Sequence, residues 1–174
     1  MNPHRIEPLG PQHDRPAFHS GSAALDRYLH QQARQDADKR VAAPFVLSLP
    51  PSSAVLGYYT LSASLLSVDE IPAEQRKRLP RYPQLPVTLL GRLAISERLK
   101  GQGIGQFLLM DALHRSLIHA AEIAAFAVLV EAKDAAAAAF YRHFDFTPLQ
   151  PQSARPVERL FLPMKTIANL FIGP

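Results

Sequence analysis

The chain has 174 residues, 47% of them hydrophobic and 20% charged, which is ordinary for a globular protein with one substantial core. It contains no cysteine, so disulfides, thiolate zinc sites and a cysteine nucleophile are excluded. There is no run of about 18 apolar residues and no apolar signal core at the start, so we expect a cytoplasmic protein without a membrane span. The net charge of +4 favours an anionic ligand.

The apolar pattern along the chain predicts one mixed α/β domain over residues 1–174, without internal repeats or a linker. In the first predicted helix, Leu25 and Ala33 recur on one face, and Ser22 can cap the N-terminus. The proline-rich segment 79–86 is expected to be an irregular surface loop. The predicted helices cover residues 22–40, 72–78, 107–121 and 135–142, and the predicted strands cover residues 41–49, 55–68, 87–95, 125–130 and 160–164.

Three glycines, Gly101, Gly103 and Gly105, stand between a predicted strand and a predicted helix. Glycine lets the backbone adopt positive φ and approach a ligand closely, and the first N–H groups of a helix lack internal acceptors. Because the helix dipole is also positive at that end, a phosphate or diphosphate is the natural ligand. The spacing fits neither a Walker A loop nor the G-x-G-x-x-G dinucleotide fingerprint, whose third glycine position falls on Gln106.

The stretch from Lys100 to Gly105 resembles the acetyl-CoA loop of the GNAT N-acetyltransferases, which is written Gln/Arg-x-x-Gly-x-Gly/Ala. Nearly the whole chain, from about residue 25 to 167, resembles the toxin branch of that family, the acetyltransferases of type II toxin–antitoxin modules. The segments that carry this second resemblance are Gly57-Tyr58-Tyr59-Thr60-Leu61, Arg76-Lys77-Arg78-Leu79-Pro80-Arg81-Tyr82-Pro83, Leu90-Gly91-Arg92-Leu93-Ala94, Ala132-Lys133-Asp134-Ala135 and Phe161-Leu162-Pro163-Met164-Lys165.

The resemblance implies a central, mostly antiparallel sheet that is flanked by helices and splays at the acetyl-CoA site. In this family the backbone of the strand before the loop binds the pantetheine, and the loop binds the diphosphate. Lys100 replaces the usual Gln or Arg, which keeps a hydrogen-bond donor and adds a positive charge. No metal is expected. The residues expected to bind acetyl-CoA are Leu93, Ala94, Ile95, Lys100, Gly101, Gln102, Gly103, Ile104, Gly105 and Phe140.

The pair Phe140-Tyr141 resembles the family's Phe-Tyr-x-x-x-Gly-Phe signature, although Asp145 replaces its glycine. Aspartate tolerates left-handed backbone better than most residues, so we expect the turn to persist. The resemblance implies that Tyr141 protonates the thiolate released when an amine attacks the thioester. A phenol of pKa about 10 is a suitable acid for a thiol of pKa about 8.5. The alternative is a tyrosine that only packs its ring.

The toxin branch acetylates the α-amino group of aminoacyl-tRNA, so the resemblance implies an RNA substrate. Basic residues that can bind its phosphates occur beside the proline-rich segment and around the first predicted helix. A solvated charged surface is the alternative for each group, and a sheet-face salt bridge is the alternative for Arg92. The candidate RNA-binding residues are Arg34, Arg40, Arg76, Lys77, Arg78, Arg81 and Arg92.

A general base is not evident in the sequence. Glu131 and Asp134 lie near the expected site, but Asp134 is better placed to cap the following helix. A free α-amino group has a pKa of about 7.7–8.0, so a useful neutral fraction exists without a base. The absence of a base therefore mildly favours an α-amine as the acceptor.

The resemblance also implies partners, namely a ribbon-helix-helix antitoxin, operator DNA bound through that antitoxin, and a second copy of the chain in a homodimer. Two other functions remain open. The protein can be an acetyltransferase of a small amine or a protein N-terminus, or it can be a non-catalytic module whose basic surface binds a protein or a nucleic acid.

Overall fold

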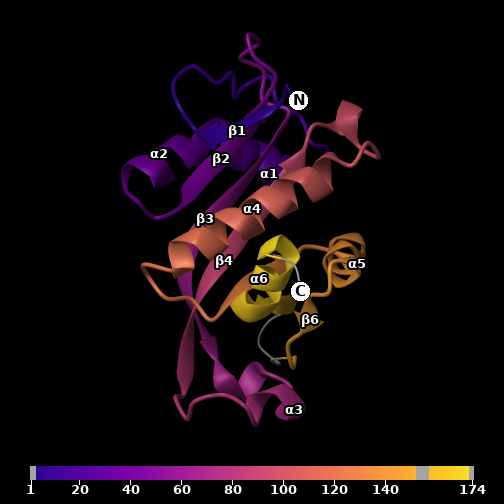
Figure 1. Ribbon diagram of the computed structural model, residues 1–174. Helices are drawn as coiled ribbons and strands as arrows, with labels where there is room; N and C mark the ends of the chain where they lie inside the picture. The colour runs from indigo at the N-terminus through magenta and orange to yellow at the C-terminus, as the bar shows by residue number, and fades with distance from the viewer. Residues whose placement is uncertain (1–2, 152–156, 173–174) are drawn as a thin grey trace. The chain divides into compact units, whose positions relative to one another are not determined.

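The computed structural model describes residues 3–151 and 157–172 (Figure 1). The strands follow the order β1-β2-β3-β4-β5-β7-β6 in a mixed sheet, so the predicted α/β class is confirmed. None of the helices in these two ranges is long and apolar enough to cross a membrane. The elements are β1 (Arg5–Pro8), α1 (Ala23–Arg27), η1 (Tyr28–Gln32), α2 (Ala33–Asp38), β2 (Ala43–Ser48), β3 (Gly57–Ser67), η2 (Val68–Glu70), α3 (Ala73–Arg76), β4 (Gln84–Ile95), η3 (Glu97–Leu99), α4 (Ile104–Ala120), β5 (Ala127–Ala132), α5 (Ala135–His143), β6 (Thr147–Pro148), β7 (Glu158–Pro163) and α6 (Met164–Ile172).

The proline-rich segment is shorter than the sequence predicts, because β4 begins at Gln84 rather than at Val87. Leu85 and Val87 are buried while Pro86 between them is exposed, which is the alternation of a half-buried strand. Pro86 has no N–H to donate, but its carbonyl oxygen accepts a hydrogen bond from the Phe126 N–H at 2.7 Å. Pro86 therefore takes part in the strand through the hydrogen bond that its carbonyl accepts, although it cannot donate one.

The chain separates into two compact units, which are described one at a time. Unit 1 comprises the described residues up to 62 together with residues 91–112. Unit 2 comprises residues 63–90 and the described residues from 113 onward.

Unit 1 is built on three antiparallel strands and the helices that follow β1. Ile6 of β1 lies opposite Leu47 of β2, and Val46 lies opposite Tyr58 of β3. The predicted cap is confirmed, since the Ser22 hydroxyl accepts from the Leu25 N–H at 3.4 Å. The π-helical turn η1 interrupts the predicted helix, and α2 then packs beside β2 (Figure 1). The core of the unit contains Phe18, Tyr28, Leu29, Ala33, Val46, Val55, Tyr58 and Ala94.

Unit 2 joins a parallel and an antiparallel strand pair. β4 pairs with β5 in parallel from Val87 opposite Ala127 to Leu90 opposite Val130, and β7 is antiparallel to β5. The helices α5 and α6 both pack against β5 and β7. The core contains Leu66, Ile71, Leu85, Val87, Ala127, Leu129, Leu149 and Phe161.

The two ends of α5 confirm predictions made from the sequence. The Asp134 carboxylate accepts from the Ala137 N–H at 2.8 Å, so Asp134 is the helix cap. After the helix, Asp145 has a φ of +68°, which is the left-handed conformation expected where the family has glycine. The turn therefore persists without the glycine.

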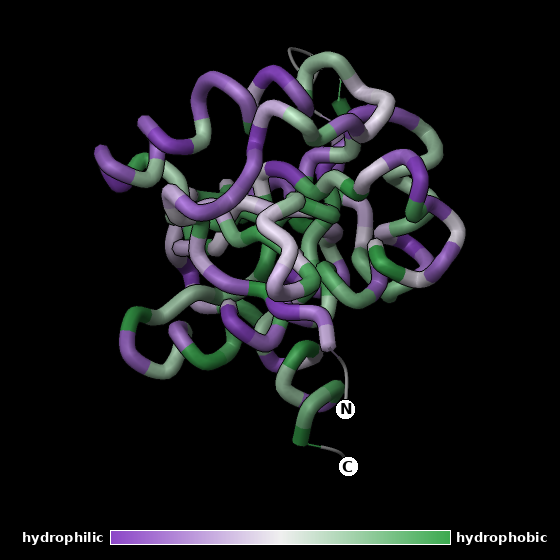
Figure 2. Tube along the Cα trace, turned by 90° about the horizontal axis from the view of Figure 1, so that it is seen from above, coloured by the Kyte–Doolittle hydropathy of each residue, from purple (hydrophilic) through white to green (hydrophobic). Residues whose placement is uncertain are grey.

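The C-terminal helix α6 was not predicted from the sequence. Its inner face carries Met164 and Ile167, both buried, while Leu170 and Ile172 are exposed. Figure 2 shows this helix, which ends beside the C label, as mostly hydrophobic. The helix has only nine residues and directly follows a strand, so its amphipathic pattern is too short to stand out in the sequence.

A buried ion pair fixes one edge of unit 2. The Arg159 guanidinium of β7 donates to the Glu70 carboxylate of η2, and both side chains are less than 10% exposed. The backbones of the same two residues also bind the segment after β6. The Leu149 N–H donates to the Arg159 carbonyl and the Gln150 N–H donates to the Glu70 carbonyl, each at 2.8 Å. The pair thus joins three segments that are distant in the sequence.

Candidate functional site

The glycine loop of unit 1 presents bare backbone at the start of α4. Gly101 and Gly103 have φ values of +80° and +79°, and apart from the adjacent residues no described atom lies within 4 Å of the position that a β-carbon would take at either residue. The first helical hydrogen bond runs from the Phe107 N–H to the Gly103 carbonyl at 3.1 Å, so the N–H groups between these residues have no helical acceptor. These features fit a phosphate or diphosphate. The positive φ expected of the glycines holds for two of the three, because Gly105 lies within α4.

The strand that leads into the loop is anchored on β3. The Ser96 N–H donates to the Leu56 carbonyl at 2.9 Å, and the Ala94 carbonyl oxygen lies 3.0 Å from where a β-carbon on Gly57 would be. A side chain at position 57 would therefore push against the backbone of β4. This close approach fixes the segment that contains Leu93, Ala94 and Ile95.

The polar side chains of the loop are exposed. The Lys100 ammonium nitrogen lies 3.2 Å from where a β-carbon on Gly21 would be, so this side chain reaches the segment before α1. The Gln102 side-chain amide reaches back to the Arg98 carbonyl at 3.5 Å.

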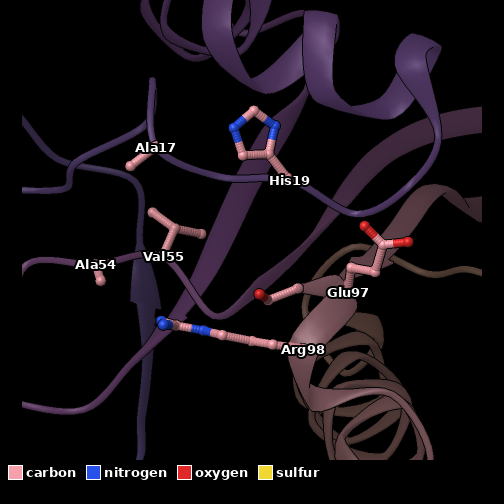
Figure 3. A pocket seen from close by; sticks show the side chains of 7 residues that line it. Ala17, His19, Ala54, Val55, Glu97 and Arg98 are labelled. Carbon is pink, nitrogen blue, oxygen red and sulfur yellow. The ribbon is translucent and has the colours of Figure 1, made fainter.

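A cavity of about 650 Å³ adjoins the residues that precede the loop. Its wall is apolar at Ala17, Ala54 and Val55, and the Arg98 side chain extends toward that wall while the Glu97 carboxylate points away from it (Figure 3). This cavity could not be predicted from the sequence, because its lining comes from three segments that lie far apart in the chain.

A second pocket, of about 340 Å³, lies beside α1 and η1 and contains the predicted residue Arg92. The Arg92 guanidinium carbon lies 3.5 Å from the centre of the Tyr28 ring, and the Tyr28 hydroxyl donates to the Asp36 carboxylate at 2.9 Å. The alternative interpretation of Arg92, a salt bridge on the sheet face, is wrong, since Arg92 forms no ion pair with any residue in the described ranges. A cation over an aromatic face takes its place.

Two titrating groups beside Arg92 are shifted. Burial, together with the hydrogen bond to Asp36, raises the pKa of Tyr28 to about 12. Hydrogen bonds from Gln32 and then Tyr28 hold the pKa of Asp36 below its usual range, and Arg92 adds to this effect. Tyr28 is therefore a neutral donor and Asp36 a charged acceptor at neutral pH.

Tyr141 belongs to unit 2, where it lies on the buried face of α5. Its ring contacts Phe140 and Phe146, with ring centres 5.3 Å apart in both pairs. Burial raises the pKa of the Tyr141 phenol well above its usual value of 10. Its hydroxyl forms no hydrogen bond with any residue that the structure describes, so the proton remains available to a ligand.

The basic residues beside the proline-rich segment also belong to unit 2 and differ from Arg92. Arg76 lies 3.9 Å from the Asp69 carboxylate, and Lys77 lies 3.2 Å from the Glu74 carboxylate. Lys77, Arg78 and Arg81 are exposed. Of the predicted residues in unit 1, Arg34 pairs with Asp38 at 3.7 Å and Arg40 is exposed.

Comparison with known proteins identifies the family. The chain is 35% identical to the tRNA-acetylating toxin of Mycobacterium tuberculosis over 137 residues, which are 78% of this chain and 80% of that protein. A protein-family model described as "Acetyltransferase (GNAT) domain" matches residues 84–167. The chain belongs to the GNAT acetyltransferases. The family resemblance, the fold class and the type of enzyme expected from the sequence are thereby confirmed, and this GNAT protein is an N-acetyltransferase.

Solved structures of GNAT toxins share the fold over nearly the whole chain. A tyrosine-to-phenylalanine mutant of KacT matches with a TM-score of 0.90 and 29% identity, covering 98% of this chain and 100% of that chain. AtaT complexed with acetyl-methionyl-tRNAfMet matches with a TM-score of 0.88 and 30% identity, covering 97% of this chain and 99% of that chain. These neighbours place the GNAT protein in the toxin branch of the family.

The structure groups the predicted site residues by unit. Unit 1 holds Arg92, the strand residues 93–95 and the glycine loop, and unit 2 holds Phe140, Tyr141 and the basic residues between Arg76 and Arg81. The functional contact of Tyr28 and Asp36 with each other and with Arg92 was not predicted from the sequence. Helical spacing predicts only that Tyr28 lies on a buried face and Asp36 on a solvent-exposed face.

Proposed function

We propose that this protein is a toxin that transfers the acetyl group of acetyl-CoA to the α-amine of aminoacyl-tRNA and thereby blocks translation. The observation that carries the proposal is the open backbone at Gly101 and Gly103 at the start of α4, in a chain of the toxin branch. This cradle fits the diphosphate of coenzyme A, because it offers N–H donors and a positive dipole at the start of a helix.

In this proposal the glycine loop binds the diphosphate and the strand before it orients the pantetheine. The paired register of β4 with β5 ends at Leu90, which supports an unpaired edge at Leu93, Ala94 and Ile95 for the pantetheine amides. Lys100 and Gln102 are expected to contribute donors at the rim of the loop, with Ile104 and Phe140 supplying apolar contacts.

Tyr141 is proposed as the acid. The amine attacks the thioester carbonyl, the carbon–sulfur bond breaks, and the Tyr141 hydroxyl gives its proton to the thiolate that leaves. Its raised pKa keeps the phenol protonated at neutral pH. The same desolvation raises the proton affinity of a thiolate formed beside it, which offsets the raised pKa of the phenol.

We also propose the partners that the toxin branch implies. AtaT has been solved with the C-terminus of the antitoxin AtaR, and a KacTA–DNA complex has been solved, both at 28% identity to this chain. By analogy, this toxin would bind a ribbon-helix-helix antitoxin and reach operator DNA through it. A homodimer acting in the cytoplasm completes the proposal.

The test is acetylation of charged tRNA by purified protein, with labelled acetyl-CoA and mass spectrometry of the released aminoacyl-adenosine. The proposal predicts one acetyl group on the α-amine, and growth arrest on expression that is relieved by Tyr141→Phe. Acetylation of small amines or protein N-termini with unmodified tRNA would overturn the choice of substrate. No turnover on any amine would instead favour a binding module.

A further inference from the structure

The Arg92 guanidinium is held in place but has its hydrogen-bond donors free. It lies over the Tyr28 ring at 3.5 Å, and it makes no hydrogen bond and no ion pair with any described residue. A ring face attracts the charge of the guanidinium but does not use the N–H donors along its edge. Those donors therefore remain available to a ligand in the pocket beside α1 and η1.

Tyr28 is itself fixed by contacts on two sides. Its hydroxyl donates to one oxygen of Asp36, while the Gln32 side-chain amide donates to the other oxygen at 2.9 Å. Its ring stacks on Tyr58 with 18° between the planes, and the Tyr58 hydroxyl donates to the Leu25 carbonyl at 2.6 Å. The platform under Arg92 is therefore rigid, which reduces the entropy lost when a ligand binds.

The pocket has the charge and the donors of an anion site. Arg27 and Arg92 are its two charged lining residues, and Gln31 and Gln32 add side-chain amides. The Asp36 carboxylate already accepts hydrogen bonds from Tyr28 and Gln32. A guanidinium with two parallel N–H groups matches the oxygens of a phosphate, and about 340 Å³ accommodates a nucleotide-sized group.

The position of Arg92 relates this pocket to the reaction. It directly precedes Leu93, Ala94 and Ile95, the backbone that is proposed to orient the pantetheine. A ligand bound by Arg92 thus lies beside the strand along which the thioester is expected. The anion belongs to the acceptor rather than to the coenzyme diphosphate, for which the glycine loop already provides a cradle.

We propose that Arg92 binds the phosphate of the nucleotide that carries the reacting amine, with Tyr28 and Asp36 as positioning residues. This inference rests on the proposed function and adds how the enzyme recognises an aminoacyl nucleotide. An acceptor amine without a nearby phosphate lacks this contact and reacts more slowly. A carboxylate on an acidic peptide has similar oxygens, so a peptide acceptor is the competing outcome.

The test compares two stable minimal acceptors, 3′-aminoacylamino-3′-deoxyadenosine with and without a 5′-phosphate. For the wild-type enzyme we expect kcat/KM to be about 10- to 100-fold higher with the phosphate, as for one charge-assisted hydrogen-bonded pair. In Arg92→Gln the ratio between the two acceptors should fall to about one, and Arg92→Lys should give an intermediate ratio, since lysine keeps the charge without the planar fork.

The positioning role has its own variants. Tyr28→Phe keeps the ring under Arg92 and should keep most of the phosphate preference, whereas Tyr28→Leu removes the ring and should lose it. Tyr28 is buried, so Tyr28→Leu can destabilise the fold; in that case the Arg92 variants alone decide the test. Arg5→Gln, an exposed arginine of the same unit, is the matched control and should keep the wild-type ratio.

Three results would overturn the inference. Equal kcat/KM for the two acceptors in the wild-type enzyme, alongside acetylation of intact aminoacyl-tRNA, would reject the phosphate contact and leave the proposed function standing. An unchanged preference in Arg92→Gln would assign the contact to another residue. Acetylation of an acidic peptide with no reaction of either nucleotide or of tRNA would reject the proposed function as well.

Discussion

The two units of this GNAT protein differ in the polar groups that are proposed to act on ligands. Unit 1 leaves donors without acceptors, at the open backbone of Gly101 and Gly103 and on the guanidinium of Arg92. Unit 2 instead has buried polar groups that are closed off from solvent, namely the ion pair between Glu70 and Arg159 and the phenol of Tyr141 in an aromatic cluster.

This difference indicates a division of labour between binding and chemistry. Donors without acceptors are useful for a ligand that arrives from solvent, because the ligand replaces water at them. A buried phenol keeps its proton until a strong base forms beside it. Substitutions in unit 1 should therefore change binding constants, and substitutions in unit 2 should change turnover or stability.

The largest effect is expected at Tyr141. Tyr141→Phe removes only the hydroxyl, so kcat should fall by about 100- to 10,000-fold, the usual contribution of a general acid, while the Kd for acetyl-CoA changes little. Tyr82→Phe, at an exposed tyrosine of the same unit, is the control and should leave kcat unchanged. Steady-state acetyl-transfer assays would measure kcat, and calorimetric titration would measure the Kd for acetyl-CoA. A kcat of Tyr141→Phe within twofold of wild type would contradict the acid role.

The pH dependence of kcat tests the acid role of Tyr141 independently. A folded-state pKa above the usual value of 10 means that Tyr141 stays protonated through the range in which an exposed tyrosine ionises. We therefore expect kcat to show no decline from this phenol up to about pH 10. A decline in kcat below pH 10 that disappears in Tyr141→Phe would show instead that the phenol ionises near its usual value.

The next largest effect concerns stability. Arg159→Met leaves the Glu70 carboxylate buried without a partner, so the free energy of unfolding should fall by about 3–5 kcal/mol. Arg142→Met breaks an exposed pair with Glu158 and should cost less than about 1 kcal/mol. Urea unfolding of both variants measures the difference, and equal losses would show that the burial of the Arg159 pair has no energetic consequence.

A smaller effect is expected in the glycine loop of unit 1. Apart from its chain neighbours, an alanine at position 103 would meet no described atom within 4 Å, so Gly103→Ala is disfavoured mainly by its positive φ. That strain is about 1–2 kcal/mol, and it should weaken acetyl-CoA binding by about tenfold as the loop relaxes. Gly10→Ala, where only the flexible Gln12 side chain is in the way, is the control, and equal Kd values would contradict the cradle.

The smallest effects are expected from the exposed basic residues of unit 2. Lys77 is already paired with Glu74, and Arg78 is exposed, so neutralising either changes RNA affinity only slightly. If Arg78 contacts a phosphate, Arg78→Gln should reduce the salt dependence of tRNA binding by about 0.7 in log–log slope. Binding titrations across salt concentrations measure this, and an unchanged slope places Arg78 outside the RNA contact.

Much of this architecture could be predicted because it depends on local rules. The caps at Ser22 and Asp134, the buried face of the first helix and the glycine turn all follow from residues close together in the sequence. The left-handed turn at Asp145 was also predictable, since few residue types tolerate that conformation.

What could not be predicted depends on contacts between distant residues. Tyr28 and Arg92 are far apart in the chain, and only the pairing of strands and helices in unit 1 places one over the other. The same holds for Glu70 and Arg159. Element boundaries were also uncertain where two signals conflict, as at Pro86, whose ring disfavours a strand while its alternating neighbours favour one.

The most direct test of the central claim measures the binding of acetyl-CoA and of acetyl-pantetheine, which has the same thioester but lacks the diphosphate. If the residues from Lys100 to Gly105 bind the diphosphate through backbone N–H groups, calorimetry should show acetyl-CoA binding at least about tenfold more tightly, as expected for charge-assisted hydrogen bonds. Equal affinities for the two thioesters, or no heat with acetyl-CoA, would contradict it.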